Sequence, residues 1–507
     1  MDWKSLIDEN GHAVIPDGIT EIRVIEEIKG KAKPWDYGAF SCCTRLTSIE
    51  IPDSVTEIGN YAFFCCTGLT SIEIPNSVTK IGDRAFDGCT GFTDIAIPNS
   101  VTEIGDYAFS GCIGLTSIEI PDSVSTIGRC AFKGCPDLTN IAIPNNVTKI
   151  WKEAFSHCAG LTSIVIPNSV TEIGDYAFSG CIGLTSIEIP ETVMKIGRGA
   201  FVGCRGLKSF NIPNGVTEIG EYAFGWCIGL TSITIPSSVT TIGENAFCWC
   251  EKLSDVNIPD SVTKIGAYAF ENCTGLDLLK IPNSVRMIED GLFADCIGLS
   301  SIEIPDSVIT IGDFAFRGCN GLISVEIPDS IKTIGYKAFH GCEKLTSITI
   351  PYGILKIGYS AFENCSSLGY MEINFPDNVT EISEGAFSEC PGLISINIPD
   401  HITKIGDYAF ANCNELTSVI IPDSVTEIDD NAFSHCSRLT SITIPNSVTT
   451  IGEEVFFGCK KLSEVNIPDS VTEIGRHAFD GCTGLVSFKI PNSVRKIEDG
   501  LFNPHCS

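Results

Sequence analysis

The spacing of the prolines constrains this chain more than any other feature. From Pro52 to Pro351 a proline recurs every 23 residues, and after one 25-residue step to Pro376 the same spacing resumes as far as Pro491. The chain therefore contains twenty copies of one short unit. A 23-residue unit cannot bury its apolar residues alone, so neighbouring copies must stack on one another. The sequence predicts a repeat solenoid and not a set of globular domains.

Each unit carries eight apolar positions that we expect to face inward. Ile72 and Ile74 are two residues apart and share one face of a short strand, which Pro75 ends. Further on, Gly82 permits a tight corner, and the residues after it have the spacing of one helical turn. Stacked strands pair in parallel at about 4.8 Å. In this unit the inward positions are Leu69, Ile72, Ile74, Val78, Ile81, Ala85, Phe86 and Cys89.

The units predict the domain organisation directly. Residues 1–40 are predicted to form a degenerate first repeat and N-terminal cap, and residues 41–507 to form one continuous solenoid. The longer step before Pro376 comes from a two-residue insertion at 374–375. An even insertion preserves the alternation of a strand, so we expect Ile373 and Phe375 both to face inward, with a local bulge.

The repeat resembles that of a known family. A Leu-x-x-Ile-x-Ile core, with Ile-Pro, Ile-Gly, Ala-Phe and Cys at fixed places in 23 residues, is similar to the BspA-like, Treponema pallidum-type leucine-rich repeat from about residue 40 to the end. The resemblance implies a right-handed solenoid of about 20 regular coils, with a parallel sheet of short strands on one face. It also implies adhesion or protein binding, often at the surface of bacteria or parasitic protists.

Charge and hydropathy narrow the partners and the compartment. The chain has 33 Lys and Arg against 63 Asp and Glu, a net charge of −30, which repels nucleic acid and anionic membranes. No apolar run approaches the roughly 20 residues that span a bilayer, and the first twenty residues lack the features of a secretory signal. We expect no membrane insertion and favour an intracellular location, the alternative being a cell-surface or secreted protein exported by a non-classical route.

Twenty of the 25 cysteines fall in one repeat column. Their Cβ atoms would be about 4.8 Å apart on successive coils, too far for a usual disulfide, and a line of thiols cannot surround a zinc ion. We expect buried, reduced thiols that pack as small apolar groups, which favours a reducing compartment. Cys42 and Cys65 lie outside this column on adjacent coils, and a strained bridge between them is an alternative.

Acidic residues gather in two columns near the predicted strands. The outward strand column contains Glu50, Glu73 and Glu119, and the position after the proline contains Asp122, Asp306 and Asp329. These six are candidate contacts for a basic protein partner. The alternative is that the charge keeps a long stack soluble.

Large aromatic residues interrupt the repeat at a few places. Trp226 and Trp249 stand on adjacent coils in the column beside the repeat Cys, where most units have a small or polar residue. Tyr222 precedes Trp226 by four residues, and Tyr268 occupies the column of Tyr222 two coils later. The four are a candidate partner-binding cluster, since Trp and Tyr are common interface anchors. The alternative is that they cover thinly packed coil edges.

No motif for catalysis, metal or cofactor stands out. The set of residues that most resembles a hydrolytic site is His401 with Asp400 beside it and Ser424 one coil away. These residues are expected on a surface without a pocket. We therefore expect a non-enzymatic protein-interaction scaffold with an extended acidic repeat surface and no cofactor. The alternative is a cell-surface adhesin that binds host or neighbouring-cell proteins or glycans. The oligomeric state stays open.

Overall fold

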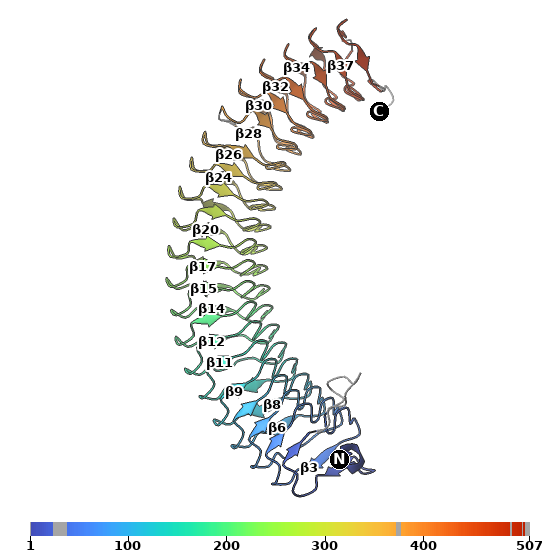
Figure 1. Cartoon of the computed structure of the whole chain (residues 1–507). Helices are drawn as coiled ribbons and strands as arrows, with labels where there is room; N and C mark the ends of the chain where they lie inside the picture. The colour runs from blue at the N-terminus through green and yellow to red at the C-terminus, as the bar shows by residue number, and fades with distance from the viewer. Residues whose placement is uncertain (1, 24–37, 372–376, 487–488, 499, 502–507) are drawn as a thin grey trace. The chain divides into compact units, whose positions relative to one another are not determined.

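The computed structural model describes residues 2–23, 38–371, 377–486, 489–498 and 500–501. Two compact units are present, Met1–Pro259 and Asp260–Ser507, and each is described by itself. Each unit is a parallel β-solenoid, and its coils follow one another along the chain (Figure 1). Among the described residues the one helix is a short 3-10 turn, η1 (Trp3–Leu6).

One ladder of strands lies just before the prolines and is called here the pre-proline ladder. Its strands pair in parallel with a 23-residue register, as in Ser209↔Ser232 and Ser232↔Asp255. In the first unit it contains β1 (His12–Val14), β3 (Ser48–Glu50), β6 (Asp94–Ala96), β8 (Ser117–Glu119), β10 (Asn140–Ile141), β14 (Ser209–Asn211), β16 (Ser232–Thr234) and β18 (Asp255–Asn257). In the second unit it contains β20 (Leu278–Lys280), β22 (Ser301–Glu303), β24 (Ser324–Glu326), β26 (Ser347–Thr349), β28 (Tyr370–Met371), β30 (Ser395–Asn397), β32 (Ser418–Ile420), β34 (Ser441–Thr443) and β36 (Glu464–Asn466).

A second ladder, which the sequence did not predict, lies five and six residues after the prolines and is called the post-proline ladder. Its two-residue strands also pair in parallel, as in Lys80↔Glu103 and Ile81↔Ile104. In the first unit it contains β2 (Glu21–Ile22), β4 (Glu57–Ile58), β5 (Lys80–Ile81), β7 (Glu103–Ile104), β9 (Thr126–Ile127), β11 (Lys149–Ile150), β12 (Glu172–Ile173), β13 (Lys195–Ile196), β15 (Glu218–Ile219) and β17 (Thr241–Ile242). In the second unit it contains β19 (Lys264–Ile265), β21 (Met287–Ile288), β23 (Thr310–Ile311), β25 (Thr333–Ile334), β27 (Lys356–Ile357), β29 (Glu381–Ile382), β31 (Lys404–Ile405), β33 (Glu427–Ile428), β35 (Thr450–Ile451), β37 (Glu473–Ile474) and β38 (Lys496–Ile497).

The segment expected to form a helical turn is not helical. The amides of Arg84, Phe86 and Gly88 donate to carbonyls of the next coil at 2.8, 2.8 and 2.7 Å. Between them, the amides of Ala85 and Asp87 donate to carbonyls three residues back. The alternation arises because Arg84 and Gly88 have φ of 54° and 76°, in the left-handed region that a right-handed helix excludes. This segment therefore joins neighbouring coils as the two ladders do.

The predicted core is confirmed. In the unit 69–89, Leu69, Val78, Ile81, Ala85, Phe86 and Cys89 are fully buried and Ile74 is 6% exposed, whereas Ile72 is half-buried. The repeat phenylalanines stack along each unit. The ring of Phe86, for example, lies 5.3 Å from those of Phe63 and Phe109, nearly parallel to both.

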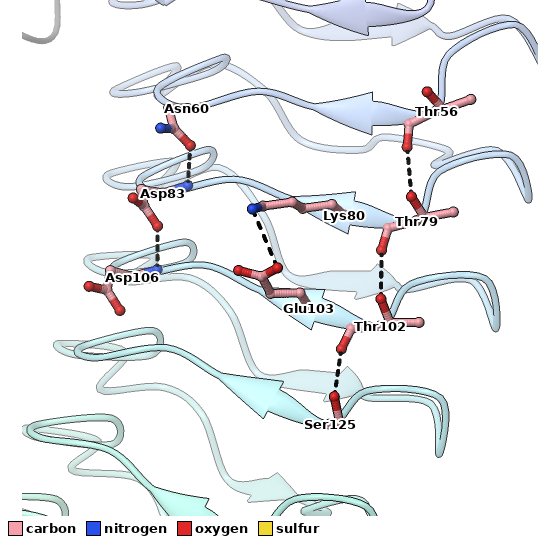
Figure 2. Close-up of polar contacts among 9 residues, drawn as sticks. All are labelled: Thr56, Asn60, Thr79, Lys80, Asp83, Thr102, Glu103, Asp106 and Ser125. Carbon is pink, nitrogen blue, oxygen red and sulfur yellow. Dashed lines mark hydrogen bonds and ion pairs between the residues drawn. The ribbon is translucent and has the colours of Figure 1, made fainter.

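Polar repeat residues connect successive coils (Figure 2). The Asn60 and Asp83 side chains accept the backbone N–H of Asp83 and Asp106, at 2.7 and 2.8 Å. The Thr79 hydroxyl donates to the Thr56 carbonyl at 3.3 Å. Asp, Asn and Thr therefore recur at these positions because each satisfies a backbone group of a neighbouring coil.

Lysines and glutamates on the post-proline ladder pair between coils. Their Nζ–Oε distances are 3.3 Å for Lys80 and Glu103, 2.8 Å for Lys149 and Glu172, and 3.4 Å for Lys404 and Glu427.

The coils on either side of the insertion remain stacked. β28 pairs with β30, and the Cys390 thiol donates to the Phe362 carbonyl across 28 residues, two more than in the other coils. Ile373 and Phe375 lie outside the described residues, so their inward placement stays a prediction. At the N-terminus β1 and β2 pair with β3 and β4, and Trp3 packs edge-on against Phe40. The domain boundaries 1–40 and 41–507 likewise stay a prediction.

Candidate partner-binding site

Three of the predicted aromatic residues lie in the first unit and are called the aromatic cluster: Tyr222, Trp226 and Trp249. Trp226 and Trp249 are 39% and 38% exposed, on consecutive coils joined by a 2.7 Å hydrogen bond from the Trp226 amide to the Cys248 carbonyl. The rings of Tyr222 and Trp226 lie 5.9 Å apart and within 10° of parallel. The structure therefore presents two indoles, with a tyrosine stacked beside one of them.

Both tryptophans occupy a backbone conformation that suits glycine. Their φ angles are 57° and 60°, and in other coils this column contains glycines with positive φ, such as Gly88, Gly111 and Gly134. A bulky residue in the left-handed region costs about 1–2 kcal/mol. Full burial would offset that cost, but more than a third of each indole is exposed. Folding alone therefore gives little reason for tryptophan at these two positions.

Tyr268, the fourth residue of the predicted cluster, lies in the second unit and is described by itself. It is half-buried, and its ring covers Gly291 on the next coil so closely that a Cβ there would collide with it. Desolvation raises the pKa of its hydroxyl, followed in size by the nearby charge of Asp290. Its position matches the alternative of an aromatic ring that covers a coil edge.

The six candidate acidic residues are all exposed, and they fall into two sets. Glu50, Glu73, Glu119 and Asp122 belong to the first unit, and Asp306 and Asp329 to the second. Among the described residues, Glu50 alone of the six has an ionisable partner within 4 Å, the ring Nε2 of His12 at 3.6 Å. Five carboxylates without an ion-pair partner are thus available to a binding partner, three in the first unit and two in the second.

The hydrolytic constellation considered from the sequence is not formed. His401 Nδ1 lies 3.5 Å from the carboxylate of Asp377. The Ser424 hydroxyl donates to the Ile402 carbonyl at 2.6 Å, and no contact joins it to His401. Within the described parts of the chain, no group of three His, Cys, Asp or Glu side chains could hold a metal ion.

Every cysteine that the structure describes is a free thiol, Cys42 and Cys65 included. The column thiols have a polar role that the sequence did not suggest, because most of them donate to a phenylalanine carbonyl of the preceding coil, whereas Cys43 donates to the Ser41 carbonyl. Cys66, for example, donates to Phe40 at 3.0 Å. Burial raises the pKa of the Cys66 thiol to about 12, so it stays protonated and unreactive.

A further set of surface residues, all exposed except the half-buried Lys332, escaped the sequence analysis. Four residues after the proline, where most coils have Thr, consecutive coils of the second unit have Arg286, Ile309, Lys332 and Leu355. Tyr336 and Tyr359 replace the usual acidic or polar residue four positions further on. Four successive departures in one column were visible in the sequence, but attention to tryptophan and to acidic residues passed over them.

Comparison with known proteins decides the family. The family model of the BspA-type leucine-rich repeat region matches residues 35–162, 148–277, 265–394 and 380–507. The chain belongs to the BspA-type leucine-rich-repeat family. This confirms the family, and the parallel solenoid, that the repeat pattern predicted.

Solved structures of similar proteins come from several bacteria. A leucine-rich-repeat protein of Bacteroides ovatus is 30% identical, with 80% of this chain and 91% of that one aligned and a TM-score of 0.45. A leucine-rich cell-surface protein of Faecalibacterium prausnitzii is 28% identical over 74% and 87% of the two chains, with a TM-score of 0.37. A leucine-rich-repeat protein of Treponema pallidum is 31% identical over 36% and 77%, with a TM-score of 0.27. No curated protein matches the chain. Among the described residues, no helix has the length and apolar character needed to cross a membrane.

Proposed function

We propose that this BspA-type protein is a non-enzymatic scaffold that binds a partner protein through the aromatic cluster. The observation that carries the proposal is the pair Trp226 and Trp249, two indoles held on consecutive coils at a backbone cost and left more than a third exposed. Tryptophan and tyrosine are the side chains most enriched at the centres of protein interfaces. Tyr222, stacked on Trp226, extends the same apolar surface.

The acidic residues of the first unit would act at longer range. Glu73, Glu119 and Asp122 are exposed and lack a cation within 4 Å, so their field attracts a basic protein before contact is made. Asp306 and Asp329 offer similar charge in the second unit. Electrostatic attraction of this kind raises the association rate more than the final affinity. We therefore assign affinity to the indoles and partner selection to the carboxylates.

An intracellular location is the first proposal for the compartment, and a surface adhesin for proteins or glycans is the alternative. The free thiols support the first less strongly than their number suggests, because the column thiols are buried, and those that are also hydrogen-bonded and raised in pKa, such as Cys66, would stay reduced in either compartment. The second is supported by the relative described as a cell-surface protein. Cell fractionation combined with surface biotinylation distinguishes the two.

The test of the binding site is a double variant, Trp226→Gly with Trp249→Gly. Glycine adopts the left-handed φ of both positions freely, so we expect thermal stability to change by only a few degrees. Partners captured by affinity purification with the wild-type chain should bind the variant at least tenfold more weakly in a direct titration.

The matched control is Trp151→Gly. Trp151 is also 38% exposed, lies in the first unit and stands in a column where glycine is common, but it is outside the cluster. We expect this variant to bind like wild type. Unchanged binding by the double variant contradicts the site, and so does unfolding of the double variant alone, since the indoles would then be structural.

A further inference from the structure

The post-proline ladder of the second unit carries a surface unlike the rest of the chain. Its members are Arg286, Ile309, Lys332, Leu355, Tyr336 and Tyr359, called here the basic–apolar patch. They belong to the coils of β21, β23, β25 and β27, in the part of the chain between β20 and β28 (Figure 1). The patch belongs to the second unit, whereas the aromatic cluster belongs to the first.

The hydrogen bonds between backbone groups of successive coils do not depend on these side chains. The amides of Ile309, Lys332 and Leu355 donate to the carbonyls of the preceding coil at 2.9, 2.7 and 2.8 Å, as at the usual threonines. The threonine hydroxyl would add a second bond to that carbonyl, as Thr403 and Thr426 show at 3.1 and 3.2 Å. Replacing Thr here therefore gives up one hydrogen bond per coil without changing the ladder.

The apolar members are left in water. Ile309 is 47% exposed and Leu355 61%, while Tyr336 and Tyr359 are 39% and 57% exposed. In the first unit a hollow is lined by Met194 and Thr217, which stand in the column of Arg286 and Ile309, and by Arg198 and Glu221, which stand in the column of the two tyrosines, so these columns open on one face. The side chains of the patch consequently present a shared surface of apolar and basic character.

The cations of the patch are not neutralised. Among the described residues no carboxylate lies within 4 Å of the side-chain nitrogens of Arg286, Lys332 or the adjoining Lys356, and Lys332 Nζ instead lies 3.5 Å from the Asp329 carbonyl oxygen. By contrast, Lys404 on the same ladder contacts both Glu427 and Asp429.

Acids are also displaced from the ladder beside the patch. The strand position that holds Lys or Glu in most other coils holds Met287, Thr310, Thr333 and Lys356 in these four coils. Asp290 and Asp313 lie nearby, and each uses one carboxylate oxygen to accept the amide of the next coil, at 2.8 and 2.7 Å. Arg286, Lys332 and Lys356 thus stand in or beside a strand column that carries no acid in these coils.

We propose that this patch docks an acidic polypeptide segment with apolar side chains between its carboxylates. Basic and apolar residues alternate from coil to coil, and cations two coils apart are about 10 Å from one another, with an aliphatic side chain between them. Unpaired cations attract carboxylates, the aliphatic side chains bury the partner's apolar groups, and the tyrosines contribute area at low conformational cost. The protein then has two binding surfaces of opposite preference.

The test restores the threonines: Arg286→Thr, Ile309→Thr, Lys332→Thr and Leu355→Thr in one variant. Because Thr is the residue that the ladder uses elsewhere, the variant should fold and be at least as stable as wild type. The probe is a fluorescein-labelled 14-residue peptide of alternating Glu and Leu, titrated by fluorescence anisotropy in low and high salt. We expect at least tenfold weaker binding by the variant, and binding to wild type that weakens as salt increases.

Two controls test whether binding depends on the position of the cations in the protein and on the sign of the charge of the peptide. Lys460→Thr with Lys461→Thr removes two exposed cations from the same unit without touching the patch and should bind like wild type. A peptide of alternating Lys and Leu should not bind. The proposal is overturned by equal binding of the Glu-Leu peptide to the wild type and the threonine variant, or by patch-dependent binding to vesicles containing phosphatidylserine without binding of the peptide. The Trp226 and Trp249 variant should bind this peptide normally, so failure here is distinct from failure of the proposed function.

Discussion

Two adjacent phenylalanines allow a sharp test of the stacked core. Phe63 is fully buried, with its ring 5.5 Å from that of Phe40 and 5.3 Å from that of Phe86. Phe64 is half-buried, and its ring meets Tyr61 edge-on at 5.8 Å. Phe63→Ala and Phe64→Ala are therefore the same substitution at neighbouring positions, one inside the coil and one outside.

The expected costs differ severalfold. Truncation of a fully buried Phe costs about 3–5 kcal/mol, which includes two stacked ring pairs of about 0.5–1.5 kcal/mol each. The half-buried Phe64 should cost about 1 kcal/mol. Taking about 4 kcal/mol for Phe63→Ala, the equilibrium for local opening rises by about 1000-fold, at 1.4 kcal/mol per factor of ten.

Hydrogen exchange measures which coils lose stability in each variant. In a repeat stack each coil contacts only its neighbours, so the loss should concentrate at the interfaces of the coil 61–66. Its amides include those of Phe63 and Cys65, which donate to the carbonyls of Ala85 and Asp87 at 2.8 and 2.7 Å. We expect their exchange to accelerate by about 100- to 1000-fold in Phe63→Ala and by less than tenfold in Phe64→Ala. Equal acceleration in the two variants, or acceleration spread evenly over residues 260–507, would refute this account of the stack.

Three further predictions follow from single contacts. In the folded Cys506→Ser protein, Ellman's reagent should titrate Cys42 and Cys65 rapidly and the other thiols only after denaturation, because the others are at most 8% exposed; early reaction of the column thiols contradicts this. Asp83→Ala should cost about 1 kcal/mol in urea denaturation by removing the acceptor for the Asp106 amide, whereas Asp83→Asn should cost little, since Asn60 fills the same role. The amine of Lys149, helped by Lys195, lowers the pKa of Glu172, so Glu172→Gln should reduce stability by less than about 1 kcal/mol at pH 7. That difference should disappear as the pH falls from the ordinary value of 4.5 through the lowered pKa, and thermal melts at pH 7 and pH 3 measure it.

The 23-residue pattern was sufficient to predict the coil, the buried core and the family, because apolar periodicity alone determines which positions face inward. It was insufficient for the segment Gly82–Cys89, where apolar spacing matches a helical turn. Two residues of that segment, Arg84 and Gly88, are left-handed, and the identity of Arg84 gives no sign of it. The glycine at Gly82 was also explained incompletely. Its φ is ordinary, and glycine is favoured because a Cβ would come within 2.8 Å of the backbone of Gly59 and Asn60 on the preceding coil.

The candidate sites were predicted less completely than the fold, since exposure depends on what neighbouring coils place beside a residue. Trp226 and Trp249 were recognised because tryptophan is conspicuous in a column of small residues. Tyr268 was placed with them because of its column, and its membership of the cluster stays a prediction. The sequence did not show that its ring covers Gly291 on the next coil. The basic–apolar patch was missed because no single member of it is unusual on a protein surface.

A regular solenoid has little polar surface to offer a ligand, because its repeat residues already bind neighbouring coils. The Thr79 hydroxyl is committed to Thr56, and the Asp83 carboxylate accepts the Asp106 amide. A partner therefore gains most where a larger side chain replaces such a residue and the backbone contacts remain intact. The basic–apolar patch meets both conditions in its threonine column. In the aromatic cluster tryptophan replaces a small residue, and the Trp226 amide keeps its bond to the Cys248 carbonyl. Tyr268 does not meet these conditions, because its bulk is already used against the next coil, and this criterion separates aromatic residues that serve the stack from those that remain available to a partner.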